Sequence, residues 1–187
     1  MSARLARRDA QAPADPELMA RLANGEIGAL GELYDQHRPH VRRFVVRATA
    51  NAEDVDDLVH ATFLQAAKSA QRYDGRASCR PWLIGIAVVL LRRRGKAFRR
   101  LMVALTFLRG IKPTSQDPRP VAHARSEVDR ALGRLSEAKR TTFLLAELEG
   151  FDCQEIADLL AVPIGTVWTR LHAARRELRV ALKGGAP

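Results

Sequence analysis

The chain has 187 residues, enough for one domain or two small ones, and only 5% of them are aromatic, so any core is largely aliphatic. Its formal net charge of +10 and its pI near 10.7 favour a polyanionic partner. Neither a membrane-length apolar run nor the apolar core of a signal peptide occurs, so we expect no membrane insertion and a cytoplasmic location.

The first half of the chain is expected to form one helical module. Residues 1–15 predict a mobile, mildly basic tail, and residues 16–100 carry apolar residues at helical spacing, without the alternation that demands a strand. The acidic stretch from Glu53 to Asp57 favours a helix N-terminus, or else a docking face for a basic protein surface. Pro81 suits the first turn of the next helix.

Two segments of this module favour nucleic-acid contact. The loop from Tyr73 to Arg80, followed by Trp82, combines cations, small residues and aromatics, a mixture that binds single strands; the alternative is that the aromatics only close a core. A run of basic residues without an acid follows, and phosphate contact is favoured there over a solvated helix end. The run comprises Arg92, Arg93, Arg94, Lys96, Arg99 and Arg100.

The helical pattern breaks over residues 101–124, where glycine, proline, serine and threonine predict a flexible linker, although its apolar beginning, residues 101–108, also suits a helix. Helical spacing resumes over residues 125–183, with Ser136 as a predicted helix cap. The sequence therefore predicts an all-α fold of two small helical domains joined by a linker.

The last third predicts a helix-turn-helix. Asp152 to Leu160 would form a first helix, and Asp152 and Glu155 have the spacing of a capping box. Gly150 is a plausible stop for the helix before it. Residues 161–164 would form the turn, and a second helix would run from Gly165 to about Leu182.

The second helix is expected to have two different faces. An apolar stripe that needs a core is formed by Val167, Leu171, Ala174, Leu178 and Leu182. The opposite face carries Trp168, Thr169, His172, Arg175, Arg176 and Arg179. Such a face suits entry into the major groove, whereas the alternative is an ordinary helical hairpin with a solvated basic face.

Catalytic chemistry is not indicated. Cys79 and Cys153 lie far apart and match no metal or redox spacing, so free thiols in a reducing compartment are expected. The five histidines show no metal-ligand spacing, and no serine or cysteine lies in a recognisable nucleophile motif. We therefore expect no metal, no cofactor and no enzymatic activity.

In combination, these segments resemble an alternative sigma factor of the extracytoplasmic-function (ECF) type, from the sigma-70 family of bacterial transcription-initiation subunits. Residues 57–64 resemble the region-2 signature, and residues 82–87, followed by the three arginines 92–94, resemble its next helix. Residues 135–140, 155–157 and 165–171 resemble region 4. The order of these matches across a linker is more specific than any one of them.

The resemblance implies promoter recognition and initiation of transcription, with a distinct partner for each segment. The largest-subunit clamp helices of core RNA polymerase would be bound by Asp54, Asp57, Leu58, Thr62 and Phe63. The melted −10 element would be bound by Tyr73, Arg76, Ser78, Arg80, Trp82, Arg92 and Arg93. The duplex −35 element would be bound by Thr166, Trp168, Thr169, Arg170, His172, Arg175 and Arg176. An anti-sigma factor would be the regulator.

The chain departs from the family pattern at four places. His60 replaces a usual glutamine, and Val88 and Val89 replace a polar residue followed by asparagine. The loss of this asparagine at Val89 implies altered −10 contacts. Trp168 replaces a usual lysine or arginine, and Ala173 replaces a frequent arginine, which implies an unusual −35 preference with apolar contact to a thymine methyl group. Two alternatives are a stand-alone helix-turn-helix regulator and a sigma-like decoy that binds an anti-sigma factor.

Overall fold

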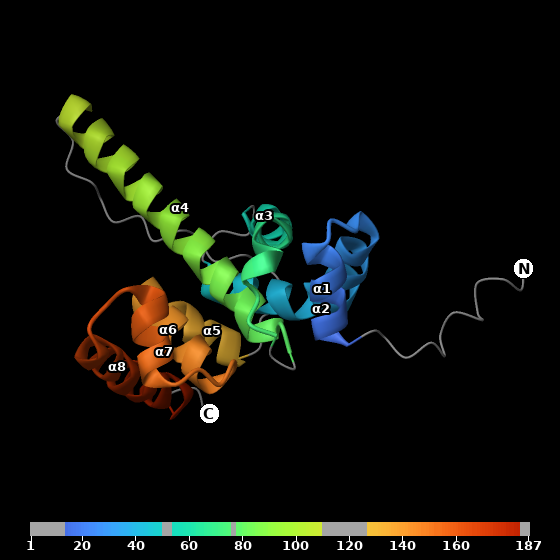
Figure 1. Cartoon of the computed structure of the whole chain (residues 1–187). Helices are drawn as coiled ribbons and strands as arrows, with labels where there is room; N and C mark the ends of the chain where they lie inside the picture. Colours follow the sequence, from blue (N-terminus) through green and yellow to red (C-terminus); the bar gives the residue numbers. More distant parts are fainter. Residues whose placement is uncertain (1–13, 50–53, 76–77, 110–126, 184–187) are drawn as a thin grey trace, which may run out of the picture.

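A computed structural model describes residues 14–49, 54–75, 78–109 and 127–183, and every regular element within these ranges is a helix (Figure 1). The all-α prediction is therefore confirmed. The elements in chain order are α1 (Asp15–Ala23), α2 (Ile27–Ala48), α3 (Val55–Ser69), the short 3-10 helix η1 (Ala70–Arg72), α4 (Arg80–Arg109), α5 (Glu127–Arg134), α6 (Glu137–Glu147), α7 (Cys153–Leu160) and α8 (Ile164–Lys183).

The first module packs α1, α2, α3 and the first half of α4 around an aliphatic core. Fully buried residues of this core include Leu18 on α1, Leu33 and Val45 on α2, and Leu83 on α4. The helix α4 continues to Arg109, nine residues past the predicted end of this module, and projects away from the rest of the molecule in Figure 1. The first part of the predicted linker is therefore helical, whereas residues 110–124 lie outside the described residues.

The second module packs α5, α6 and α7 against α8. The predicted capping box is confirmed: the Glu155 amide donates to Asp152 Oδ1 at 2.8 Å, and the Asp152 amide donates to Glu155 Oε2 at 2.9 Å. Gly150, with φ of +74°, occupies the left-handed region after α6, as expected of a helix stop. Ser136 lies at the predicted N-cap of α6, but its side chain makes no capping hydrogen bond.

The turn of the helix-turn-helix is tight. Ala161 ends α7 in the left-handed conformation, with φ of 49°, and its amide donates to the Asp158 carbonyl at 3.2 Å. The apolar stripe of α8 is confirmed for Val167, Leu171, Ala174 and Leu178, which are buried. The prediction was wrong for Leu182, whose exposed fraction is 39%, whereas its neighbour Ala181 packs against the core.

The two modules lie against each other. α2 contacts α5 and α6, α4 contacts α7, and one hydrophobic cluster runs through both modules. Arg47 on α2 also donates to Asp129 on α5 at 3.1 Å. Nothing in the sequence pattern indicated this packing, because helical periodicity reports which face of a helix is buried and not what covers it.

Candidate nucleic-acid and polymerase interfaces

The recognition helix α8 presents the predicted polar face to solvent. Five of the residues expected to contact DNA have exposed side chains: Trp168, Thr169, His172, Arg175 and Arg176. Thr166 and Arg170 are half-buried at the edges of this face. Because residues near the N-terminus of the second helix of a helix-turn-helix contact base edges, this arrangement suits duplex recognition.

The side chains near the start of α8 differ in how they are held. Trp168 is 58% exposed, although tryptophan is usually largely buried. The Thr169 hydroxyl donates to the Gly165 carbonyl at 2.8 Å, which fixes its rotamer. Further along, Arg175 donates to Glu147 Oε1 through Nε at 2.9 Å and through Nη2 at 2.6 Å. The helix therefore combines an exposed aromatic ring with a cation that an acid already holds.

The predicted single-strand segment precedes and begins α4. Tyr73 and Trp82 are half-buried and pack edge to face, with 5.5 Å between ring centroids. Ser78 is exposed, and its Oγ accepts from the Arg80 amide at 3.3 Å, so it supports the start of α4. Arg76 lies outside the described residues. Each ring is therefore partly packed and partly accessible, and the contact of these aromatics with a single strand stays a prediction.

The arginines of this segment have different surroundings. Arg80 bonds to Glu149 and Arg92 bonds to the Leu159 carbonyl, so both contact the second module. Arg93 is exposed, and Arg94 forms an ion pair with Asp54 at 2.7 Å. Val89, which replaces the family's usual asparagine, lines the same surface beside Arg93. Of these arginines, one thus faces solvent, one pairs with the acidic start of α3, and two contact the second module.

Three of the residues expected to contact the polymerase are core residues. Leu58, Thr62 and Phe63 are 4%, 0% and 2% exposed, and the Thr62 hydroxyl donates to the Leu58 carbonyl at 2.7 Å. Their side chains pack α3 against its neighbours in the isolated chain, and the predicted contact of these three residues with the polymerase stays a prediction. The signature motif places apolar residues at helical spacing, and that spacing marks the buried face of α3.

The exposed face of α3 carries other residues. Asp57 is exposed, and so are His60 and Leu64, which the sequence prediction did not select for this face. His60 stacks on Tyr34 with 5.7 Å between ring centroids, and the Tyr34 hydroxyl lies 3.1 Å from His60 Nε2. The spacing 57, 60, 64 is the signal in the sequence that identifies a continuous exposed stripe on a helix.

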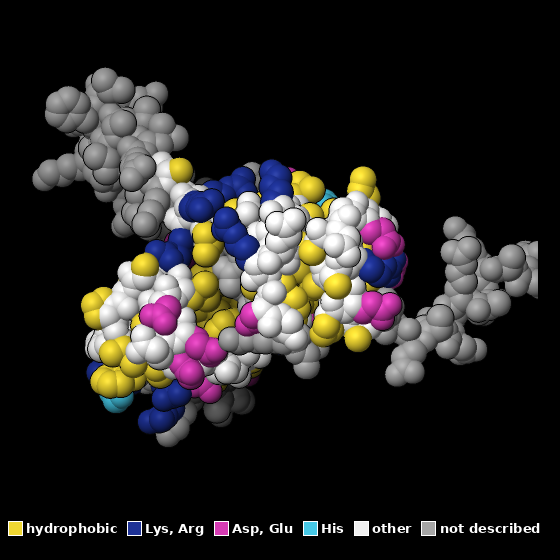
Figure 2. Space-filling model, viewed as in Figure 1, with side chains coloured by type: hydrophobic (Ala, Val, Ile, Leu, Met, Phe, Trp, Pro, Cys, Tyr) yellow, Lys and Arg dark blue, Asp and Glu magenta, His cyan; other side chains and the backbone are white. Residues whose placement is uncertain are grey.

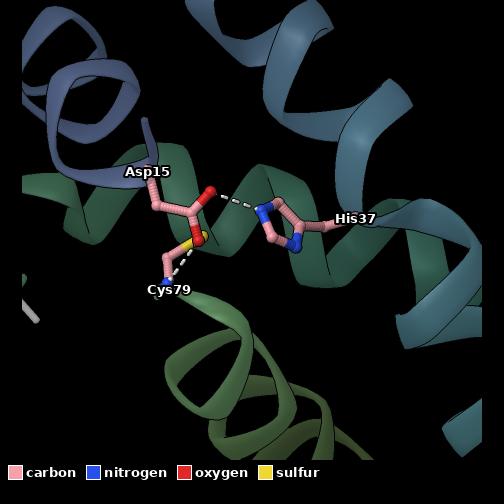
Figure 3. A group of neighbouring side chains, drawn as sticks. All are labelled: Asp15, His37 and Cys79. Atoms are coloured by element: carbon pink, nitrogen blue, oxygen red, sulfur yellow. Dashed lines mark hydrogen bonds and ion pairs between the residues drawn. The ribbon is translucent and has the colours of Figure 1, made fainter. Parts of the chain in front are cut away.

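Asp15, His37 and Cys79 come together in the first module, although they are far apart in the sequence (Figure 3). Asp15 Oδ1 accepts from His37 Nε2 at 2.7 Å and from Gln36 Nε2 at 2.9 Å, and Oδ2 accepts from the Cys79 amide at 2.7 Å. Burial raises the pKa of the Cys79 thiol far above its ordinary value, and the Asp15 carboxylate adds to this shift. Because its carboxylate accepts three hydrogen bonds from residues of α2 and from the residue before α4, Asp15 acts as a polar tie between α1, α2 and the start of α4.

These observations define the class of protein: an all-helical DNA-binding protein that combines a helix-turn-helix module with a second, cationic helical module. Two family models match the chain, sigma-70 region 2 over residues 33–100 and sigma-70 region 4 over residues 125–178. Together they cover more than half of the chain.

Individual proteins agree with this match. The ECF RNA polymerase sigma factor SigL of Mycobacterium tuberculosis is 31% identical over 180 residues, which cover 88% of this chain and 97% of SigL. SigE of Mycolicibacterium smegmatis is 32% identical over 169 residues. This match covers 84% of this chain but only 64% of the length of SigE. The fold is similar to that of the sigma factor RpoE, solved with the anti-sigma factor NepR from Bartonella quintana, with a TM-score of 0.61, 21% identity, and coverage of 83% and 98% of the two chains.

The chain belongs to the sigma-70 family and is a sigma factor of the ECF type. It is therefore a non-enzymatic subunit of RNA polymerase that initiates transcription at specific promoters. The alternative of a stand-alone helix-turn-helix regulator accounts for residues 125–178 only, whereas region 2 is matched as well. Within the described residues, no helix combines the length and apolar character that crossing a bilayer requires.

Proposed function

We propose that this sigma factor reads a duplex −35 element with α8 and holds the unpaired −10 strand with the segment from Tyr73 to Arg93. The exposed aromatic and cationic face of α8, on a helix-turn-helix fixed by its capping box, is the observation that carries the −35 assignment. The −10 assignment is supported by the half-exposed pair Tyr73 and Trp82 beside several arginines, since stacked bases and paired phosphates are how single strands are held. Residues 16–100 and 125–183 would be the two functional domains.

Trp168 gives the −35 contact its chemical character. Trp168 is the fifth residue of α8, and its ring is exposed. It therefore lies near the N-terminus of the helix, which is the part that enters the major groove. An indole ring cannot make the bidentate hydrogen bonds that lysine or arginine makes to guanine, but it packs well on the thymine methyl group. The −35 element of this sigma factor is therefore proposed to be rich in thymine where Trp168 meets it.

Core polymerase is proposed to dock on the exposed stripe of α3. Asp57 offers a carboxylate that is 77% exposed, and Leu64 offers an apolar contact that is 56% exposed. Asp54 lies at the start of the same helix, partly neutralised by Arg94. A stripe of this kind suits the clamp helices of the largest subunit, with α3 held in register by its buried face.

The regulator is proposed to be an anti-sigma factor, and the location the cytoplasm, where RNA polymerase works. The complex of RpoE with NepR supports the first of these by the similarity of fold. The two-module organisation, with a contact surface on each module, also suits a regulator that binds both.

Run-off transcription with bacterial core RNA polymerase and a library of promoter fragments tests the function. We expect transcripts from a subset of fragments that share two sequence elements, and loss of these transcripts when Arg175 and Arg176 are both replaced by alanine. A purified chain that neither binds core polymerase nor yields any transcript, with its regulator removed, would contradict the proposal.

A further inference from the structure

Three side chains with different metal-binding atoms converge in the core of the first module (Figure 3). A carboxylate oxygen of Asp15, a ring nitrogen of His37 and the sulfur of Cys79 all lie within 4.8 Å of one another, and all three residues are buried. The ligand atoms of a tetrahedral zinc ion are roughly 3.3–3.6 Å apart, which follows from bonds of about 2.0 Å to nitrogen or oxygen and about 2.3 Å to sulfur. Movements of about 1 Å would therefore let all three atoms bind one ion.

The three residues come from different elements. Asp15 is the first residue of α1, His37 lies in the middle of α2, and Cys79 directly precedes α4. Metal-ligand motifs in a sequence are recognised by short spacings, and these residues are too far apart to form one. The structure therefore brings together a ligand set that the sequence analysis did not predict.

The kinds of donor atom favour zinc. Sulfur, imidazole nitrogen and carboxylate oxygen are its three protein ligands, whereas calcium and magnesium prefer oxygen alone. Asp15 can bind through one oxygen or both, so these side chains supply three or four of the four ligands that zinc prefers. With the Cys79 sulfur deprotonated, the two negative charges of Asp15 and Cys79 balance a divalent ion, and the buried group is neutral as a whole.

The hydrogen bonds of the group suit an exchange of partners. His37 Nε2 lies 2.7 Å from Asp15 Oδ1, while its Nδ1 is buried and has no hydrogen-bond partner among the described residues. An ion between the two side chains thus replaces one hydrogen bond of the ring and breaks no other. Gln36 Nε2 and the Cys79 amide donate to the two Asp15 oxygens at 2.9 and 2.7 Å, as the outer partners of a metal-binding carboxylate do.

The same carboxylate changes its effect on the thiol once a cation lies between them. Burial and the charge of Asp15 raise the pKa of the Cys79 thiol, because both disfavour a negative sulfur. A divalent cation attracts the carboxylate and the sulfur alike, and a coordinating thiol is deprotonated outright. On binding, the S–H bond breaks, a zinc–sulfur bond forms, and the proton passes to the solvent.

We propose that Asp15, His37 and Cys79 form a zinc site that joins α1, α2 and the start of α4. The site is independent of the −10, −35 and polymerase assignments, since none of them uses these three residues. Because the ion binds the folded chain through three elements, it stabilises the first module. It also holds the residue that immediately precedes α4.

Cobalt(II), which takes the same ligands and absorbs light, is the probe for this site. The full chain without a histidine tag is treated with a chelator and a thiol-free reductant, and is then titrated with Co²⁺. We expect a near-ultraviolet thiolate-to-cobalt absorption that saturates at one ion per chain and disappears when Zn²⁺ is added. Figure 2 shows acidic side chains on the surface of both modules, but carboxylates that bind cobalt there give no thiolate absorption.

The chain has only two cysteines, so Cys153→Ser identifies the sulfur without a change in the core. The Cys153→Ser chain should keep the thiolate absorption, and Cys79→Ser should lose it. Asp15→Asn should bind Co²⁺ at least about tenfold more weakly, whereas Glu17→Gln, at an exposed position of the same helix, should bind it as the wild-type chain does. Zn²⁺ should raise the urea midpoint of Cys153→Ser but not that of Asp15→Asn.

A wild-type chain that shows no thiolate absorption with micromolar Co²⁺ would overturn the site, and this measurement does not depend on whether Cys79→Ser folds. Absorption that disappears in Cys153→Ser would assign the sulfur to Cys153 and overturn it as well. Wild-type affinity for Co²⁺ in Asp15→Asn would exclude the carboxylate as a ligand and contradict the site of three residues.

Discussion

Arg175 on the recognition helix is held by Glu147 at the end of α6, through two hydrogen bonds of 2.9 and 2.6 Å to a single carboxylate oxygen. Both side chains are substantially exposed, with 56% of Arg175 and 38% of Glu147 accessible. An exposed pair of this kind contributes little to stability, but it occupies a cation that is proposed to meet phosphate. Binding to DNA therefore exchanges one anionic partner of Arg175 for another.

Arg175→Ala is expected to weaken binding to the −35 duplex. A plot of the logarithm of the binding constant against the logarithm of the salt concentration should also become less steep by about 0.9, because each phosphate contact contributes that much to its slope. Glu147→Gln should have the opposite effect on affinity, since it leaves Arg175 free. Fluorescence anisotropy with a promoter duplex over a range of salt concentrations measures both. A salt dependence unchanged by Arg175→Ala would exclude a phosphate contact.

Trp168 is expected to distinguish thymine from uracil in the −35 element. Replacing the thymines by uracil removes only the methyl groups, and a buried methyl is worth about 0.8 kcal/mol, or roughly fourfold in affinity. The wild-type chain should bind the duplex with uracil at the contacted position more weakly by this amount than the duplex with thymine. Trp168→Phe should show a smaller difference between the two duplexes, and Trp168→Ala should bind them equally. The same discrimination in the wild-type and alanine chains would assign the methyl contact to another residue.

Local features of the second module were predictable from the sequence, because each depends on residues close in the chain. The capping box of Asp152 and Glu155 spans three residues, and the buried stripe of α8 from Val167 to Leu178 follows from helical spacing alone. The stripe failed at Leu182, whose side chain is 39% exposed although the residue continues the same helical spacing. Periodicity predicts a face, but the length over which it is covered is a tertiary property.

The contacts that give the site its properties were not predictable, since they join residues far apart in the sequence. Arg80 and Glu149 are separated by 69 positions, and Asp15 meets Cys79 across 64. Phe63 illustrates the converse: the signature motif marked it as functional, although its position in the motif reflects a place in the core. A motif identifies a family, and the structure adds which of its residues are buried in the isolated chain.

Asp57→Lys is expected to reduce binding of core RNA polymerase by at least about tenfold, because the substitution places a cation where a basic partner surface is proposed. The Asp57 carboxylate is largely exposed and 4.0 Å from Arg94, so the fold should tolerate the change. Binding of the −35 duplex should be unaffected, since α8 lies in the other module. Glu17→Lys on α1 makes the same change in charge at another exposed position and should leave polymerase binding intact. Equal loss of both activities in Asp57→Lys would indicate misfolding.

Asp15 is expected to make the stability of the first module depend on pH. Burial raises the pKa of this carboxyl, but hydrogen bonds from the Cys79 amide and from His37 outweigh it, so the pKa lies below its ordinary value of 3.8. A carboxyl whose pKa is lower in the folded state stabilises the fold fully above its unfolded pKa and loses this contribution as the pH falls through the folded value. The free energy of unfolding should therefore fall as the solution is acidified below about pH 4.

Urea unfolding of the full chain at several pH values, followed by circular dichroism, tests this expectation. Asp15→Asn should lower the free energy of unfolding at pH 7 by about 2 kcal/mol, because it leaves hydrogen bonds to a charged acceptor unmade. The variant should also lose part of the decline in stability below pH 4, since it has no carboxyl to protonate at this position. Glu17→Gln, two residues away and exposed, is the matched control and should retain the wild-type pH dependence. If Asp15→Asn and the wild-type chain lose stability in parallel on acidification, the acid sensitivity comes from other carboxylates, and the tie between α1, α2 and α4 does not depend on the charge of Asp15.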